Sequence, residues 1–203
     1  MFRDPSAFDP KLTHTGIEQA KQLQEIIVDL YENDCNSIDC IVFSPMQRAL
    51  MTGNIACEKL FAKLQCEDKA KIPALIALEC IRERYGIHIC DRRRSIDIIR
   101  KEYPNIDFDS DFKFPEDSLH AEHERETHEH LIFRGYQFLE WLNRQHNFKS
   151  VLVFSHSSYL MNIFNAVLDF EVGGNQTMQD VDDLKKWFNT GELKSVEVVL
   201  RQI

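Results

Sequence analysis

Two short apolar runs in this sequence predict strands that are buried on both faces. One is Val151 to Phe154, which reads VLVF, and the other is DCIVFS, from Asp39 to Ser44. Continuous apolar runs of this length, rich in β-branched residues, are typical of parallel sheets covered by helices. Each run is followed by a polar turn, at Ser44 or Ser155, and then by apolar residues at helical spacing. This repeated pattern predicts a three-layer α/β/α domain with a mostly parallel sheet.

The predicted helices lie on either side of these strands. Apolar residues recur at helical spacing in the ranges 12–33, 45–55, 131–142 and 157–167. Thr13 or Thr15 is placed to cap the first of these helices, and Thr15 with Glu18 fits a capping box. Pro45 suits the start of the second helix, and Ser157 or Ser158 suits the cap of the last. Helices at these places complete two strand-turn-helix units.

The remaining segments are less regular. The sequence SVEVVLRQI at the end of the chain alternates between apolar and polar residues, so it predicts a closing strand with one exposed face. Prolines interrupt the range 65–127, which we expect, together with 170–190, to form a lid over the site. Because there is no internal repeat and no long linker, we expect one domain over residues 1–203.

Composition and charge exclude several classes of function. The chain has 203 residues, of which 43% are hydrophobic and 28% charged, as in ordinary globular proteins. A formal net charge of −9 argues against nucleic acid as a partner. No apolar stretch reaches membrane-spanning length, and no signal peptide precedes the first helix, so we predict a cytoplasmic protein without a membrane partner. The cysteines are scattered and form no C-x-x-C pair, which indicates reduced thiols.

Three residues carry the chemistry that the sequence suggests, and each has a plain structural alternative. His156 follows a predicted strand and precedes a helix, at the rim where open α/β sheets bind ligands, but it can also be satisfied by a backbone carbonyl in a turn. Arg48, in the first turns of a helix, can simply pair with a carboxylate on the surface. Glu83 lies among mixed charges, where most glutamates are only solvated.

Several motifs in order make a stronger case than any one of these residues. They are FDPKLTHTG, SPMQRALMTG, RERYG, CDRRRSIDIIRKEYPNIDF, RETHEHLIFRG and FSHSSYL. Together they resemble the histidine phosphatase superfamily, the phosphoglycerate mutase-like proteins, and most closely its plant and fungal phosphoglycerate mutase-like branch.

The resemblance implies a reaction and gives three residues a role in it. Members of this family transfer a phosphoryl group to a histidine nitrogen, and water or a second substrate then resolves the phosphohistidine. By motif, Arg48 would clamp the phosphate, Glu83 would be the general acid and base, and His156 would contact the phosphoryl oxygens. We therefore expect a metal-independent phosphomonoesterase without a cofactor. Its partner would be a phosphorylated small molecule or a phosphoprotein.

One motif of the family is missing from this sequence. None of its eight histidines stands in an R-H-G or R-H-A triplet, which in the family ends the first strand and supplies the nucleophile. We therefore expect the first strand of the family's sheet to be absent and the domain to be N-terminally incomplete. Two interpretations remain open: a truncated form of an active enzyme, or an inactive relative that binds phosphorylated ligands or protein partners. Whether the chain is an enzyme, and its oligomeric state, are left open.

Two further clusters have alternative interpretations. By themselves, Arg92, Arg93 and Arg94 indicate an exposed basic turn or a weak nuclear localisation signal. The resemblance of CDRRRS to the family motif indicates instead that they help to shape the pocket. In the sequence HAEHERETHEH, a helix would bring His120, Glu124 and His128 to one face, and His128 with His130 would chelate a divalent ion. The alternative is a solvated, pH-sensitive loop, and we predict no metal.

Overall fold

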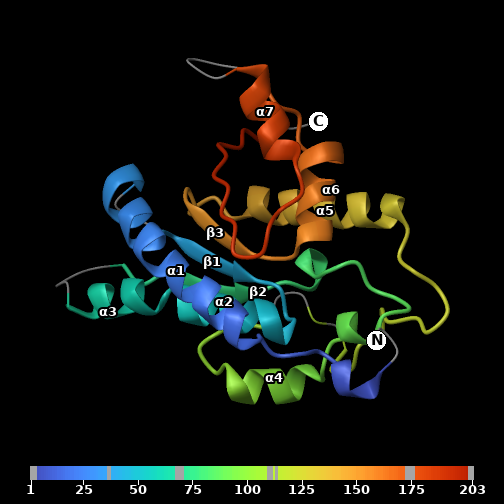
Figure 1. Cartoon of the computed structure of the whole chain (residues 1–203). Helices are drawn as coiled ribbons and strands as arrows, with labels where there is room; N and C mark the ends of the chain where they lie inside the picture. Colours follow the sequence, from blue (N-terminus) through green and yellow to red (C-terminus); the bar gives the residue numbers. More distant parts are fainter. Residues whose placement is uncertain are drawn as a thin grey trace.

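A parallel three-stranded sheet forms the centre of the computed structural model, which describes residues 4–35, 38–66, 71–108, 112, 114–171 and 177–200 (Figure 1). The strands are β1 (Cys40–Phe43), β2 (Ala74–Ala77) and β3 (Val151–Phe154), in the order β2-β1-β3. Cys40 pairs with Ala74 on one side and with Val151 on the other, and Phe43 pairs with Ala77 and Phe154. The carboxyl ends of all three strands therefore meet at one edge of the sheet.

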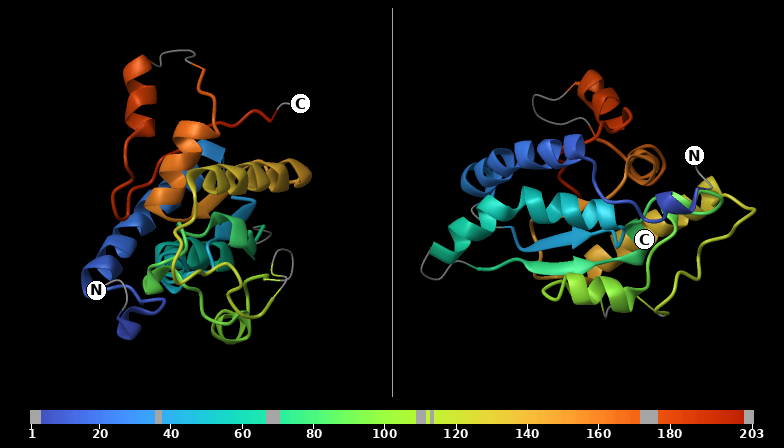
Figure 2. Two further views of the ribbon diagram at one scale, coloured as in Figure 1. Left: turned by 90° about the vertical axis from the view of Figure 1, so that its right-hand side faces the viewer. Right: turned by 60° about the horizontal axis from the view of Figure 1, so that its bottom comes forward.

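Helices surround this sheet, and short helical turns lie between them. The helices are α1 (His14–Leu30), α2 (Gln47–Ala56), α3 (Glu58–Cys66), α4 (Ile96–Glu102), α5 (His128–Arg144), α6 (Ser157–Ala166) and α7 (Met178–Lys185). The short turns are η1 (Pro5–Ala7), η2 (Tyr31–Cys35), η3 (Glu79–Ile81) and η4 (Ile89–Asp91). All views place α4 and α7 at opposite ends of the molecule (Figures 1 and 2).

The alternation of side chains along β1 divides the core into two layers. Ile41 and Phe43 pack with buried residues of α1, α2, α3 and α4, whereas Cys40 and Val42 pack with those of α5 and α6. Successive side chains of a strand point to opposite faces, so a fully apolar strand needs cover on both sides. This arrangement confirms the predicted α/β/α architecture with a parallel sheet.

Several boundaries differ from the prediction. The first helix is capped by Thr13, whose hydroxyl accepts a hydrogen bond from Gly16 N at 3.2 Å, so the Thr15–Glu18 capping box is wrong. Helix α6 has no side-chain cap, because His156 occupies its N-cap position and the Ser157 hydroxyl donates to Phe188 O instead. Strand β2 lies in the range that the pattern left irregular.

Two strand predictions also need correction. Strand β3, predicted to be buried on both faces, is only partly buried along most of its length, because it is an edge of the sheet among the described residues. The predicted closing strand, residues 195–203, is also wrong over 195–200, and its last three residues lie outside the described ranges. Residues 192–200 contain no strand, because no described backbone hydrogen bond joins 193–200 to a sheet, although Leu193 and Val196 still pack on the core.

None of the helices described in this structure is both long and apolar enough to cross a membrane.

Candidate functional site

The carboxyl ends of β1 and β3 bring a serine and a histidine into contact. Ser44 directly follows β1, and its backbone N–H continues the sheet by donating to Phe154 O at 2.8 Å. His156 follows β3 after one intervening residue. Ser44 Oγ lies 2.7 Å from His156 Nε2, and both side chains are buried. The parallel register therefore places the histidine at the edge of the sheet where ligands bind in open α/β folds.

The surroundings of His156 keep its ring neutral. Burial lowers the pKa of His156 well below its usual value, and the positive charges of Arg48, Arg82 and Arg134 lower it further. A neutral imidazole has one donor and one acceptor nitrogen. If the Ser44 hydroxyl donates to Nε2, the proton of the ring is on Nδ1, and Nδ1–H becomes a donor for an anionic oxygen.

Arg48 reaches the same region from the first turn of α2. Its Nη1 donates to Cys90 O at 2.8 Å, and its Nη2 donates to Asp91 Oδ1 at 3.0 Å. The side chain of Arg48 is 24% exposed and that of Asp91 is 7% exposed. The arginine thus does pair with a carboxylate, but the pair is mostly buried and adjoins His156, which differs from the surface pair considered as the alternative.

Glu83 lies beside these residues, just after η3, and is partly buried. Burial raises the pKa of its carboxyl group, and the negative charge of Asp91 raises it further. The backbone N–H groups of Arg84 and Ser158 and the charge of Arg48 act in the opposite direction. With burial dominant, Glu83 keeps its proton to a higher pH than a solvated glutamate, which suits a general acid.

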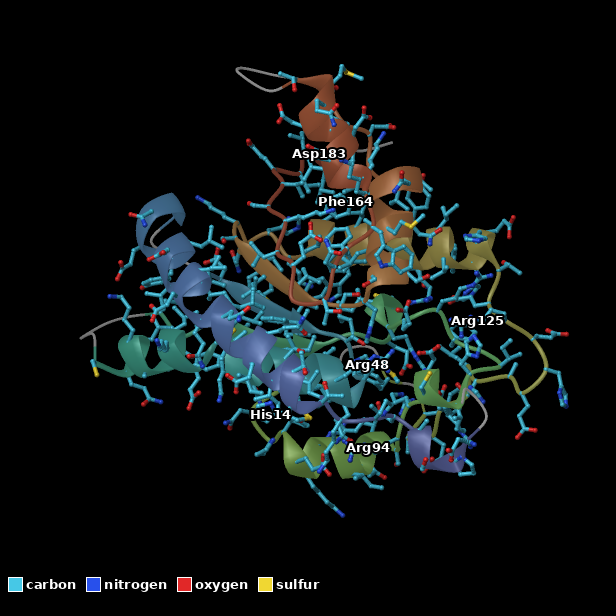
Figure 3. All side chains as sticks on the ribbon, in the orientation of Figure 1. His14, Arg48, Arg94, Arg125, Phe164 and Asp183 are labelled. Carbon is cyan, nitrogen blue, oxygen red and sulfur yellow. The ribbon has the colours of Figure 1, made fainter. Side chains whose placement is uncertain are left out.

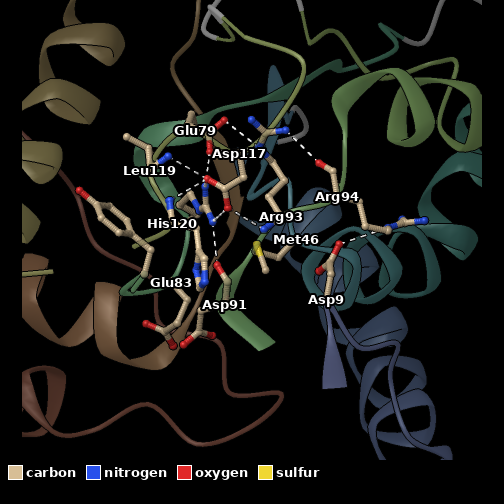
Figure 4. A network of polar contacts seen from close by, with 12 residues as sticks. Asp9, Met46, Glu79, Glu83, Asp91, Arg93, Arg94, Asp117, Leu119 and His120 are labelled. Atoms are coloured by element: carbon tan, nitrogen blue, oxygen red, sulfur yellow. Dashed lines mark hydrogen bonds and ion pairs between the residues drawn. The ribbon is translucent and has the colours of Figure 1, made fainter. Parts of the chain in front are cut away.

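A network of buried ion pairs holds the loop that carries Glu83. The fully buried Arg82 donates to Glu79 Oε1 at 2.6 Å, to both carboxylate oxygens of Asp117 and to Asp91 O at 2.7 Å (Figure 4). Arg134 of α5 donates to Cys80 O at 2.7 Å and to Arg82 O at 2.9 Å. These bonds hold the backbone directly before Glu83, at Cys80 and Arg82.

The comparison with protein families agrees with this arrangement. The family model of the histidine phosphatase superfamily (branch 1) matches residues 6–181. The chain belongs to the histidine phosphatase superfamily. The match includes Arg48, Glu83 and His156, which the fold brings to one edge of the sheet.

Relatives from plants and fungi support the predicted branch of this superfamily. Phosphoglycerate mutase-like protein 1 of Arabidopsis thaliana is 29% identical over 214 residues, covering 97% of this chain and 72% of the relative. A probable phosphoglycerate mutase of Arthroderma benhamiae is 32% identical over 105 residues, covering 51% of this chain and 30% of the relative. The resemblance drawn from the motifs is thereby confirmed.

A solved structure shares the fold. The crystal structure of the ecdysone phosphate phosphatase from Bombix mori, in complex with tungstate, matches with a TM-score of 0.56 at 15% sequence identity. The match covers 98% of this chain and 79% of that structure. It shows that this member of the histidine phosphatase superfamily has the fold of a known phosphatase.

Sequence reasoning missed several residues of this histidine phosphatase site. It placed Ser44 at a turn after a strand, but not against His156, although the register of two parallel strands was the available signal. It also missed Asp91 and Arg125, which form an ion pair at 2.8 Å. Asp91 lies inside the motif CDRRRS, where the arginines attracted attention and the aspartate did not.

The three arginines of that motif have different positions. Arg93 is buried, and its Nε lies 3.0 Å from Glu79 Oε2. Arg94 forms two hydrogen bonds of 2.8 Å to the carboxylate of Glu102. Arg92 is exposed, with its guanidinium over the ring of Phe8. An exposed basic turn is therefore wrong for Arg93, which is buried, and for Arg94, which is held by the exposed Glu102 and by the buried Asp9.

The alternative metal site does not form. Residues 118–127 are not helical, so His120, Glu124 and His128 do not share a helix face. Within the described ranges, no group of three or more histidine, cysteine, aspartate or glutamate side chains is arranged to hold a metal ion.

Proposed function

We propose that this chain forms the binding and acid part of a phosphomonoesterase that acts through a phosphohistidine intermediate. The neutral, serine-bonded His156 beside Arg48 and the partly buried Glu83 is the observation that carries the proposal. The substrate would be a phosphorylated small molecule or a phosphoprotein, because the clamp recognises the phosphoryl group and not the leaving group. The reaction uses no metal ion in this proposal.

Each residue has a distinct task. Arg48 carries a permanent, planar charge with several donors, so it neutralises the oxygens of the phosphoryl group. Nδ1–H of His156 donates a hydrogen bond to one of those oxygens. Because the imidazole is neutral, this bond adds no positive charge to the site. Glu83 gives its proton to the leaving oxygen, and as the carboxylate it then accepts a proton from the attacking water.

The phosphoryl acceptor is the part of the reaction that this sequence leaves open. The phosphohistidine mechanism needs a histidine that attacks phosphorus, and none of the eight histidines stands in the family triplet. We propose that such a histidine comes from a strand outside the given sequence, on the edge of β3 that pairs with no strand among the described residues. The second candidate function is an inactive relative that binds phosphorylated ligands or protein partners.

The experiment that tests the proposal compares two forms of the chain on a generic aryl phosphate with chelator present. One form is residues 1–203. The other form has an additional segment before residue 1, which contains a strand that ends in R-H-G or R-H-A. We expect hydrolysis only by the extended form, and its loss in His156→Ala and Arg48→Gln. The matched control is Arg144→Gln, which removes one positive charge from an exposed ion pair on α5 and leaves hydrolysis unchanged.

Binding separates the two candidate functions. Binding of inorganic phosphate or tungstate is measured by calorimetry on residues 1–203 and on the extended form. Binding that depends on Arg48, with no turnover by either form, would support the inactive relative. No phosphate binding by either form would overturn both the phosphomonoesterase and the relative that binds phosphorylated ligands, since both need the clamp, and would leave only a relative that binds protein partners.

A further inference from the structure

Asp91 lies between two arginines that come from distant parts of the chain. Its Oδ1 accepts from Arg48 Nη2 at 3.0 Å, and its Oδ2 accepts from Arg125 Nη1 at 2.8 Å. Arg48 belongs to α2, and Arg125 belongs to the segment before α5 (Figure 3). One carboxylate therefore joins α2 to the segment before α5.

Asp91 is itself held in place. It ends the short helix η4, it is buried, and its carbonyl oxygen accepts from the fully buried Arg82 at 2.7 Å. Cys90, the residue before it, accepts from the other terminal nitrogen of Arg48 at 2.8 Å. The end of η4 thus accepts two hydrogen bonds from the Arg48 guanidinium. These bonds use two of its five N–H groups.

The carboxylate of Asp91 also adjoins that of Glu83. The close view shows the two carboxyl groups side by side, turned to the same space below the network of buried ion pairs (Figure 4). Arg48 and Asp91 are the charged groups that act on Glu83, in opposite directions. The charge of Asp91 helps Glu83 to keep its proton.

We propose that Asp91 is a positioning residue, which holds the Arg48 guanidinium in the orientation that binds a phosphoryl group. The inference rests on the proposed function, since it assigns Arg48 to that group. An arginine side chain that is one quarter exposed has many rotamers, and fixing them before the ligand arrives removes part of the entropy cost of binding. The opposite possibility is that Asp91 occupies the place of the anion and competes with it.

The test measures inorganic phosphate binding by calorimetry in a double-mutant cycle of Asp91→Asn and Arg48→Gln. We expect Asp91→Asn to weaken binding by about three- to tenfold, which is the cost of ordering one long side chain. In the Arg48→Gln background we expect Asp91→Asn to have no further effect on phosphate affinity. Asp91 acts through Arg48, so its replacement changes nothing once the guanidinium is absent. Tighter binding by Asp91→Asn would overturn the inference, and so would additive effects.

The matched control is Asp39→Asn. Asp39 is similarly buried and pairs with Lys71 at 2.7 Å, but it precedes β1, at the amino end of the sheet. We expect this variant to lose stability and to keep the phosphate affinity of the wild type. Equal losses of affinity in both aspartate variants would mean that a general loss of packing weakens the site, which also overturns the inference.

A second readout does not depend on a ligand. The titration of the Glu83 carboxyl carbon, followed by NMR, is expected to move to lower pH in Asp91→Asn and to stay in place in Asp39→Asn. If the wild type binds phosphate through Arg48 and neither readout responds to Asp91→Asn, the inference alone is wrong. If the wild type binds no phosphate, the proposed function fails and the clamp role of Asp91 fails with it. The titration then decides only whether Asp91 acts on Glu83.

Discussion

Nε2 of His156 lies 2.7 Å from Oγ of Ser44, in the buried space between the ends of two parallel strands. The contact joins residues 112 positions apart, and it is made possible by the register in which Phe43 pairs with Phe154. Because burial lowers the pKa of the histidine, the hydrogen bond joins the hydroxyl to a neutral imidazole. If the serine donates to Nε2, the proton of the ring is on Nδ1, and if the serine accepts, the proton is on Nε2.

Replacement of the serine should therefore change the tautomer. Ser44→Ala leaves Nε2 without its partner, so we expect a loss of about 1–3 kcal/mol in the free energy of unfolding and a mixture of tautomers. The imidazole 15N shifts report the tautomer, and calorimetry reports a weaker affinity for phosphate. Ser157→Ala is the control, because its hydroxyl bonds only to Phe188 O. A single, unchanged tautomer in Ser44→Ala would contradict the assignment.

The lowered pKa of His156 also predicts how stability depends on pH. The unfolded histidine binds a proton near its ordinary pKa of 6.5, whereas the pKa of the folded one lies well below this value. Between those values the unfolded state holds more protons, so the free energy of unfolding falls as the pH falls below 6.5. The greatest slope from one such group is about 1.4 kcal/mol per pH unit.

Denaturant unfolding of the wild type and of His156→Gln, between pH 7.5 and 5, measures this slope. Subtraction of the two curves removes the contributions of His88 and His120, whose pKa values are also lowered. We expect the wild type to lose stability more steeply below pH 6.5 and the two slopes to agree above it. Parallel curves over the whole range would show that His156 is not buried in its neutral form.

The parts of the fold that the sequence predicted are those with a strong local pattern. Strands β1 and β3 have continuous apolar runs, and they lie where these runs predicted them. Strand β2 was missed because its sequence, ALIA, is short and half alanine, so only its pairing with β1 distinguishes it from a loop. The prediction of the closing strand was wrong although its local pattern was clear. Alternation of apolar and polar residues does not show whether another strand is available for pairing.

The site shows the same division. Arg48, Glu83 and His156 were found through motifs, and the place of His156 also followed from the end of a strand. The roles of these three residues remain predictions. Asp91 was missed because its importance comes from contacts with Arg48 and Arg125, which are 43 and 34 positions away in the chain. Local patterns hold no information about such contacts.

Asp9 offers a test of how the first motif supports the site. Its Oδ1 accepts from Gln47 N at 2.9 Å, so it caps α2 from a distance, and Met46 at the N-cap position provides no such bond. We expect Asp9→Ala to lower the free energy of unfolding by roughly 2 kcal/mol, through the lost cap and the lost bond to Arg94. Chemical denaturation measures the change.

Two variants make the Asp9 test specific. Asp9→Asn should recover much of the loss, because asparagine can cap a helix and also tolerates the positive φ of 38° found at this position. Asp4→Ala removes an exposed aspartate that caps only η1, and it should leave stability nearly unchanged. Equal losses from Asp4→Ala and Asp9→Ala would contradict the distant cap.

Gly53 brings α2, and with it Arg48, close to the sheet. A Cβ atom at this position would lie 2.3 Å from Phe43 Cε1 and 2.9 Å from Phe154 Cδ2, in the stacked ring pair at the ends of β1 and β3. Since these rings are buried, Gly53→Ala must move either the rings or the helix. We expect a loss of about 1–3 kcal/mol in the free energy of unfolding, despite the better helix propensity of alanine.

The displaced helix should also affect the site, because Arg48 lies less than two turns before Gly53 on α2. We expect weaker phosphate binding in Gly53→Ala, measured by calorimetry on the folded variant. Gly16→Ala is the matched control: its Cβ would be 3.2 Å from the end of the flexible Leu12 side chain, so both stability and affinity should stay close to those of the wild type. If Gly53→Ala kept full affinity while losing stability, the position of α2 would not limit phosphate binding, and Arg48 would have to reach the ligand through its own flexibility.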